Sequence, residues 1–188
     1  MTELATTPGV AGLVPAGTWR VDGSHSTVEF GIRHLLITTV KGTFGNFEGT
    51  IEVAPDGAAK ATGVIKSESI DTNEPQRDQH LQSADFFDAA NFPEINFEST
   101  EIGGVDGTSF KVVGDLTIRG TTRPIELEAT FEGAAKDPWG NDRIGLTVKG
   151  NLDPNDYGVD WNQELEAGGN LLGDRVDFTA SVSAVKEA

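Results

Sequence analysis

The sequence contains no cysteine, so it can form neither a disulfide framework nor a thiolate metal cluster, and it offers no cysteine nucleophile. Basic residues are also scarce: 14 Lys and Arg stand against 30 Asp and Glu, which gives a formal net charge of −16. Nucleic-acid-binding proteins normally present a basic stripe to the phosphates, and this excess of acid argues against one. We therefore predict that nucleic acid is not a partner.

Long apolar runs are missing as well. No uninterrupted apolar stretch approaches the ~20 residues that a membrane-spanning helix needs. The first 17 residues contain no Lys or Arg and only one short apolar run, Val10 to Val14, whereas a secretory signal has a basic start and an apolar stretch of ~7 to 15 residues. We predict a disordered tail over residues 1–17, a cytoplasmic location and no stable insertion into a membrane.

The sequence also lacks the common motifs of catalysis and nucleotide binding. It has no Gly-x-x-x-x-Gly-Lys phosphate loop and no Gly-x-Ser-x-Gly nucleophile elbow. Only three histidines occur, His25, His34 and His80, and only the tertiary fold could bring them together as metal ligands or as an acid and base. We expect ordinary hydrogen-bonded histidines, with no metal and no cofactor.

What the sequence does have is a strand-like alternation of apolar and polar residues. In residues 27–34, Val28, Phe30 and Ile32 share one face of an extended chain, and the same period of two recurs to the end of the sequence. Turn sequences rich in Gly, Asn and Asp separate these segments. Roughly eight strands with short connections predict a mainly β fold, an antiparallel barrel forming one domain over residues 18–188. Residues 75–84 interrupt the pattern and predict one short helix.

Small residues fall among the inward-facing positions of the predicted strands. They are Gly31, Gly49, Gly63, Gly114, Ala129 and Ala180. A barrel of about eight strands is either filled by its side chains or just wide enough for one ligand. Small inward residues favour a cavity, but they also suit close packing, so the alternation leaves both possibilities open.

Several ordered motifs resemble the YceI-like, polyisoprenoid-binding family. They are VDGSHSTVEF at 21–30 followed by His34, RDQHLQSADFFD at 77–88 with Phe92-Pro93 and Phe97-Glu98-Ser99, GDLTIRGTTRP at 114–124, YGVDWN at 157–162 and GDRV at 173–176. The resemblance extends from about Gly17 to Val185. It implies a lipocalin-like antiparallel barrel with an internal hydrophobic tunnel, which binds a polyisoprenoid, an isoprenoid quinone-like lipid or a similar long amphiphile without catalysis. It also favours a homodimer.

This resemblance and the clustered aromatic residues together indicate which residues contact the ligand. The predicted contacts are Phe30, Ile32, His34, Phe44, Phe47, Arg77, His80, Leu81, Phe86, Phe97, Leu116, Ile118 and Trp161. Arg77, His80 and His25 either organise the barrel mouth or satisfy buried polar groups. Two other functions stay open: an enzyme that uses a histidine as acid or base on a bound apolar substrate, and a structural or stress-associated module with a filled barrel.

Overall fold

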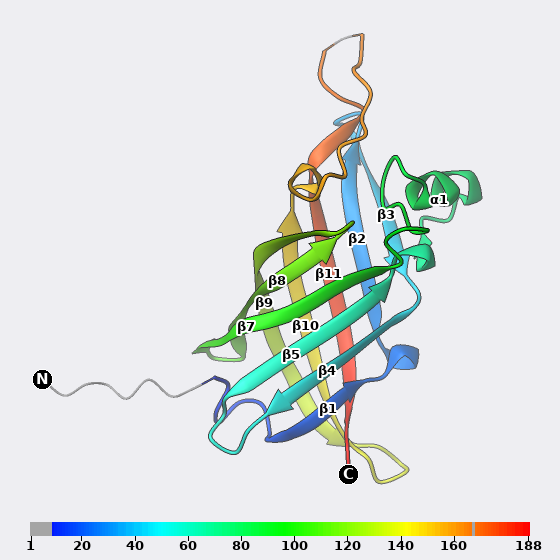
Figure 1. The fold of residues 1–188 in the computed structure, drawn as a ribbon. Helices are drawn as coiled ribbons and strands as arrows, with labels where there is room; N and C mark the ends of the chain where they lie inside the picture. The colour runs from blue at the N-terminus through cyan, green and yellow to red at the C-terminus, as the bar shows by residue number, and fades with distance from the viewer. Residues whose placement is uncertain (1–8, 167) are drawn as a thin grey trace, which may run out of the picture.

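The structure, a computed structural model, describes residues 9–166 and 168–188. Within these residues the chain forms almost entirely strands, with one α-helix (Figure 1). The elements in chain order are β1 (Gly17–Val21), η1 (Gly23–His25), β2 (Thr27–His34), β3 (Thr38–Phe44), β4 (Phe47–Val53), β5 (Ala59–Lys66), η2 (Ser67–Ser69), β6 (Ile70–Asp71), α1 (Pro75–Gln82), β7 (Glu94–Asp106), β8 (Ser109–Ile118), β9 (Thr121–Lys136), β10 (Asp142–Leu152), η3 (Pro154–Tyr157) and β11 (Leu172–Lys186).

One sheet curves round on itself and closes. Its neighbouring strands follow the order β1-β4-β5-β7-β8-β9-β10-β11, and β11 pairs again with β1. At this closing seam Trp19 lies opposite Lys186 and Val21 opposite Ala184. Every pairing between strands is antiparallel, as expected for strands joined mainly by short turns. The prediction of a mainly β, eight-stranded antiparallel barrel with one short helix is confirmed.

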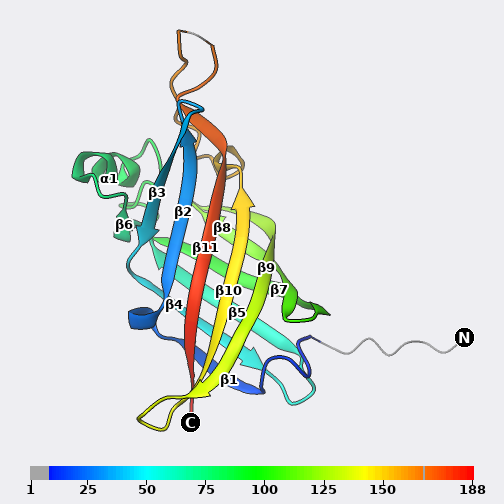
Figure 2. The ribbon, with the colours of Figure 1, turned by 180° about the vertical axis from the view of Figure 1, so that it is seen from behind.

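The three additional strand segments arise because three of the eight strands are broken. Both β1 and β2 pair with β11, one after the other, and are separated by residues 22–26. In the same way β3 continues into β4 after Gly45-Asn46, and β5 continues into β6 after η2. Beyond these breaks β2, β3 and β6 form a leaf that extends the barrel wall past the closed ring (Figure 2).

The two ends of the barrel differ. We call the end that carries α1 and the β2–β3 turn the helix end, and the end that carries the β4–β5 and β9–β10 turns the floor end (Figure 1). The helix α1 begins at Pro75, and the side chain of Glu74 caps it by accepting a hydrogen bond from the Gln76 amide. It lies against β6. The predicted helix is therefore present, and it ends two residues earlier than the 75–84 expected.

Residues 9–16 pack as turns against the floor end. Val10 is 1% exposed and Val14 5% exposed, and both belong to the main core cluster with Trp19. Of the tail predicted over residues 1–17, residues 1–8 lie outside the described part of the chain, whereas Gly9 onward is packed rather than extended into solvent. This short segment closes one end of the barrel.

Candidate functional site

The barrel encloses a cavity of about 210 Å³. Its wall comes from all eight strands of the ring, from β1 to β11, and from residues 9–16 at the floor end. The largest side chains along it are those of Phe47, Phe97 and Phe110, and Ile51, Leu116 and Leu127 are among the aliphatic residues beside them. Three polar residues, Glu48, Thr50 and Thr62, also border it, but they occupy the outward positions of β4 and β5. The interior is therefore apolar.

Small side chains leave the space open. Gly49, Gly63, Ala129 and Ala180 all line the cavity. At Gly63 an added Cβ would meet only the carbonyl oxygen of Glu48, at 3.7 Å, so open space lies in front of this residue. The two other small positions do not contribute in this way, since Gly31 and Gly114 are absent from the cavity wall. At Gly49 the space is taken by Val21, whose Cγ2 would lie 2.9 Å from an added Cβ. Strand alternation thus places four of the six small residues on the cavity wall, with open space shown at Gly63.

A second cluster of buried side chains stands between the cavity and the helix end. It consists of Phe44, Ile70, Ile95, Ile118 and Tyr157, with Phe30, Leu81 and Phe87 packed against it. The ring centroids of Phe30 and Phe44 are 5.4 Å apart, and those of Phe44 and Phe87 are 5.9 Å apart. Burial raises the pKa of the Tyr157 hydroxyl. We call this group the helix-end cluster.

The predicted contact residues fall into three places. Phe47, Phe97 and Leu116 line the cavity. Phe30, Phe44, Leu81 and Ile118 belong to the helix-end cluster, and Ile32 and His34 lie further along β2, both half-buried. The third set, Arg77, His80, Phe86 and Trp161, lies around α1, outside the cavity wall.

Ring contacts hold His80, Phe86 and Trp161 of this third set together, and a hydrogen bond joins His80 to Asp85. The imidazole of His80 lies edge-on to the rings of Phe86 and Trp161, with centroid distances of 5.0 and 4.9 Å. Its Nε2 lies 2.8 Å from Oδ2 of Asp85. Since the side chain of His80 is 41% exposed, one edge of this assembly meets solvent. It is a mixed polar and aromatic rim at the helix end.

Arg77 has a positioning role at the start of α1. Its Nε donates to Oγ1 of Thr72 at 2.7 Å, and Nη2 donates to the Thr72 carbonyl at 2.8 Å. The Thr72 hydroxyl and amide in turn donate to Oδ1 of Asp78, at 2.6 and 2.8 Å. These contacts satisfy the buried Thr72 and tie α1 to β6.

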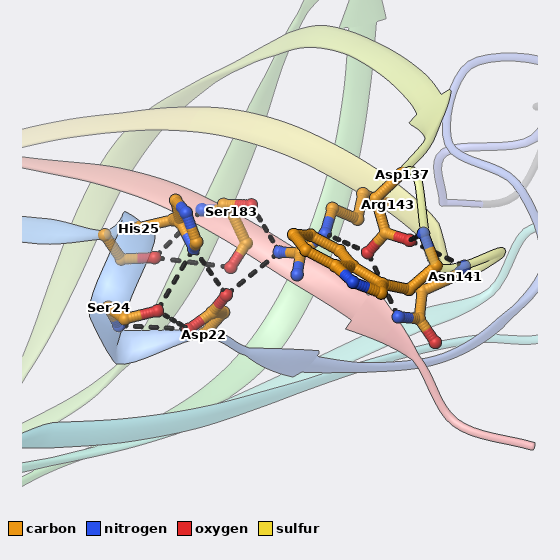
Figure 3. Close-up of polar contacts among 9 residues, drawn as sticks. Asp22, Ser24, His25, Asp137, Asn141, Arg143 and Ser183 are labelled. Atoms are coloured by element: carbon orange, nitrogen blue, oxygen red, sulfur yellow. Dashed lines mark hydrogen bonds and ion pairs between the residues drawn. The ribbon is translucent and has the colours of Figure 1, made fainter.

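Polar side chains also gather at the break between β1 and β2, where Figure 3 shows Arg143 between two carboxylates. Nη1 of Arg143 lies 2.9 Å from Asp22, and Nε lies 2.9 Å from Asp137. Hydrogen bonds from Ser24, His25 and Arg143 hold the pKa of Asp22 far below its usual range. Burial raises the pKa of Asp137, but the hydrogen bond from Arg143 and those from the 139–141 turn outweigh it, so this pKa is also strongly lowered.

The same cluster brings together a serine, a histidine and an aspartate, but not as a catalytic triad. Nδ1 of His25 lies 3.1 Å from Oγ of Ser24 and 2.8 Å from Oδ2 of Asp22. A triad places the serine and the carboxylate on opposite ring nitrogens, so that the base can take the serine proton while the acid orients it. Here both contact one nitrogen, and the arrangement is suited to fixing the chain rather than to nucleophilic attack.

Other kinds of site receive no support from the described residues. They contain no group of three or more His, Cys, Asp or Glu side chains placed to hold a metal ion. In the part of the chain that the structure covers, no helix has the length and apolarity needed to cross a membrane. A wider depression of about 580 Å³ lies outside the floor end, bordered by Glu52, Lys60 and Lys186, but it is open to solvent.

Sequence reasoning missed the residues that close the cavity at its floor. Val10 and Val14 line the cavity from a segment without regular secondary structure. The one signal available was the short apolar run that contains them. A run of this length does not by itself distinguish a buried turn from an apolar stretch within a tail.

Comparisons with known proteins agree with this architecture. A family model described as a YceI-like domain matches residues 19–184. The UPF0312 protein SA2479 of Staphylococcus aureus is 40% identical over 163 residues, which cover 85% of this chain and 92% of that protein.

Two solved structures have the same fold. The crystal structure of a Campylobacter jejuni YceI protein superposes with a TM-score of 0.72 at 29% identity, covering 84% of this chain and 91% of that one. A polyisoprenoid binding domain from Saccharophagus degradans superposes with a TM-score of 0.69 and covers 92% of this chain and 100% of that one. At 15% identity, the second likeness concerns the fold alone.

Proposed function

Because the chain belongs to the YceI-like family, we propose that it binds the apolar chain of a long amphiphile inside its barrel and acts as a carrier or store. The proposed ligand is a polyisoprenoid or an isoprenoid quinone-like lipid. The observation that carries the proposal is the apolar cavity of about 210 Å³. The polyisoprenoid binding domain with the same fold supports this choice of ligand class.

An empty apolar cavity is costly to a folded protein. At about 24 cal/mol per Å³, a void of 210 Å³ corresponds to roughly 5 kcal/mol of stability relative to a filled core. An apolar chain restores these contacts, and each buried methylene contributes about 0.8 kcal/mol. The cavity therefore favours ligand binding over a structural module with a filled barrel.

The volume limits how much of a long ligand the cavity takes. A cavity of roughly 150 Å³ accommodates benzene, so 210 Å³ holds only the terminal part of a polyisoprenoid. We propose that the rest of the ligand's apolar chain passes through the helix-end cluster. The side chains of Phe30, Phe44 and Phe87 change rotamer to let it through. On this path Arg77, His80 and Trp161 lie nearest the polar end of the ligand.

The part of the ligand inside the cavity meets no acid or base. Among the described residues that line the cavity there is no histidine and no inward-facing acid. An acid or base must come within hydrogen-bond reach of the atom it protonates or deprotonates. The apolar chain is therefore bound without chemistry, and His80, beside the polar end, is the histidine at which replacement by alanine tests for turnover.

A substitution at Gly63 tests the proposal. Leucine at this position projects into the open space of the cavity and competes with the ligand. We expect Gly63→Leu to fold normally and to weaken the binding of farnesol and geranylgeraniol at least tenfold, measured by displacement of a fluorescent lipid. Lys60→Leu is the matched control, because this side chain points outward from the same strand and does not line the cavity. Equal affinity of Gly63→Leu and the unchanged protein would exclude the cavity as the binding site.

Two further parts of the proposal concern assembly and location. We propose a homodimer, by analogy with the family, and light scattering coupled to size-exclusion chromatography measures it. The cytoplasmic location stays a prediction that cell fractionation tests.

A further inference from the structure

The floor of the cavity comes from a segment that lies outside the matched family domain. The match begins at residue 19, whereas the residues that close the cavity at this end are Val10 and Val14. Both side chains are almost fully buried, and both contribute to the main core cluster. The floor is thus formed by residues that precede the part of the chain matched by the family model.

Hydrogen bonds fix this segment at both of its ends. The Val10 amide donates to the carbonyl of Gly57, in the β4–β5 turn, at 2.8 Å. The Val14 amide donates back to the Val10 carbonyl at 3.1 Å, which closes a turn. At the other end Nε1 of Trp19 donates to the Pro15 carbonyl at 3.0 Å. The two valines are therefore held in place over the end of the barrel.

Close backbone contact between residues 9–14 and the β4–β5 turn fixes the position of this segment. Gly57 has φ of +91°, and a Cβ there would overlap Ala11, while a Cβ at Gly9 would overlap the Gly57 carbonyl. Only glycine allows both approaches without displacement. The segment and the β4–β5 turn therefore fit one another.

We infer that Val10 and Val14 form a stop for the apolar end of the ligand and so set how much chain the barrel can bury. This inference rests on the proposed function, because it concerns the same cavity. The ligand enters from the helix end with its apolar end first, and the chain advances until it meets the two valines. Each carbon added beyond the length that reaches from the stop to the helix end stays in solvent and adds no affinity.

A length series of linear saturated alcohols tests the stop. While the added methylenes are buried, the dissociation constant falls by about fourfold for each one. We call the alcohol length beyond which the affinity stops rising the end point.

Val14→Ala deepens the cavity and moves the end point to a longer alcohol. Val14→Leu raises the floor and moves it to a shorter one. Val105→Ala, on an exposed part of β7, is the control and leaves the end point unchanged.

The outcomes separate the inference from the proposed function. If the unchanged protein binds no alcohol of any length, the proposed function fails. If it binds them but the end point is the same in Val14→Ala and Val14→Leu, only the stop is wrong. Should neither variant fold, the length series on the unchanged protein still tests the stop. An affinity that keeps rising up to the longest alcohol contradicts a fixed stop.

Discussion

At the scale of single residues, Arg143 links the start of β10 to the turn that precedes it and to a break in the chain that is distant in sequence. From β10 it binds Asp22 at the break after β1 and Asp137 in the β9–β10 turn. Its side chain is 23% exposed and that of Asp137 only 7%, so water screens this pair less than the exposed pairs elsewhere. The planar guanidinium can serve two carboxylates at once. Arg143 thus fixes the geometry beside the closing seam.

Acid should loosen this cluster. The pKa values of Asp22 and Asp137 are lowered in the folded protein, so the stability that they contribute is present above about pH 4 and is lost as the pH falls below it. We expect Arg143→Gln to lower the midpoint of thermal unfolding at pH 7 and to flatten its dependence on pH below 4. Thermal melts from pH 7 to pH 2 measure both effects.

The exposed pair of Arg175 and Asp177 provides the control, since both side chains are about two-thirds exposed. Arg175→Gln should change neither the midpoint nor its pH dependence. An Arg143→Gln variant with the same acid profile as the unchanged protein would show that Asp22 and Asp137 do not depend on this arginine.

At the scale of elements, the β2–β3 turn requires positive φ angles but contains leucines, which disfavour them. Leu35 and Leu36 occupy its two central positions with φ of 54° and 62°, and the Ile37 amide donates to the His34 carbonyl at 3.2 Å. This is a turn in which both central residues are left-handed, a position normally taken by Asn-Gly. Leu36 is 59% exposed and Ile37 73% exposed, so burial does not offset the strain.

Replacing Leu35-Leu36 by Asn-Gly should therefore stabilise the protein. The left-handed conformation costs roughly 1 to 2 kcal/mol for an ordinary residue, and we expect a gain of about 1 to 2 kcal/mol overall. For a chain of this size, that raises the unfolding midpoint by about 2 to 8 °C, which calorimetry measures. Ile37→Thr removes a comparable apolar side chain without changing the turn and should leave the midpoint unchanged. A lower midpoint for Asn-Gly would mean that the leucines contribute packing.

The sequence predicts the positions of strands better than the positions of the breaks within them. The period of two in residues 27–34 predicts β2 with its observed bounds, because side chains alternate between the apolar interior and solvent. The breaks at 22–26 and 45–46 were not predicted. They depend on contacts with distant residues, such as the hydrogen bond from Oγ of Ser26 to the Ser183 carbonyl.

The site could be predicted only in outline. Of the residues predicted to contact a ligand, Phe47, Phe97 and Leu116 do line the cavity, and the contact itself stays a prediction. The cavity ends where Phe30, Phe44 and Tyr157 pack together in the helix-end cluster. The alternation of apolar and polar residues along the sequence does not show this packing. The same holds for Val10, whose burial requires the β4–β5 turn as a partner.

At the scale of the whole molecule, the net charge of −16 surrounds an apolar interior. A strongly acidic surface favours dispersion in water. It also opposes lasting contact with an anionic bilayer, whose surface repels acidic proteins. For the carrier function proposed above, we therefore expect loading by a brief encounter with the membrane or by a partner protein.

Vesicle flotation tests this expectation. Ligand-free protein should stay unbound when mixed at low salt with vesicles rich in phosphatidylglycerol, because the repulsion is then least screened. Phosphatidylcholine vesicles are the uncharged comparison. Strong binding to the anionic vesicles that weakens as salt is added would contradict the prediction and reveal a basic docking surface.

The seam between β1 and β11 also has a consequence for biosynthesis. The residues that close the ring, 19–21 and 184–186, stand at opposite ends of the domain sequence. While a ribosome is still synthesising β11, the growing chain has unpaired edges on β1, β2 and β10 and no complete wall around its interior. A nascent chain cannot enclose a ligand, so the proposed lipid can enter the barrel only after translation has finished.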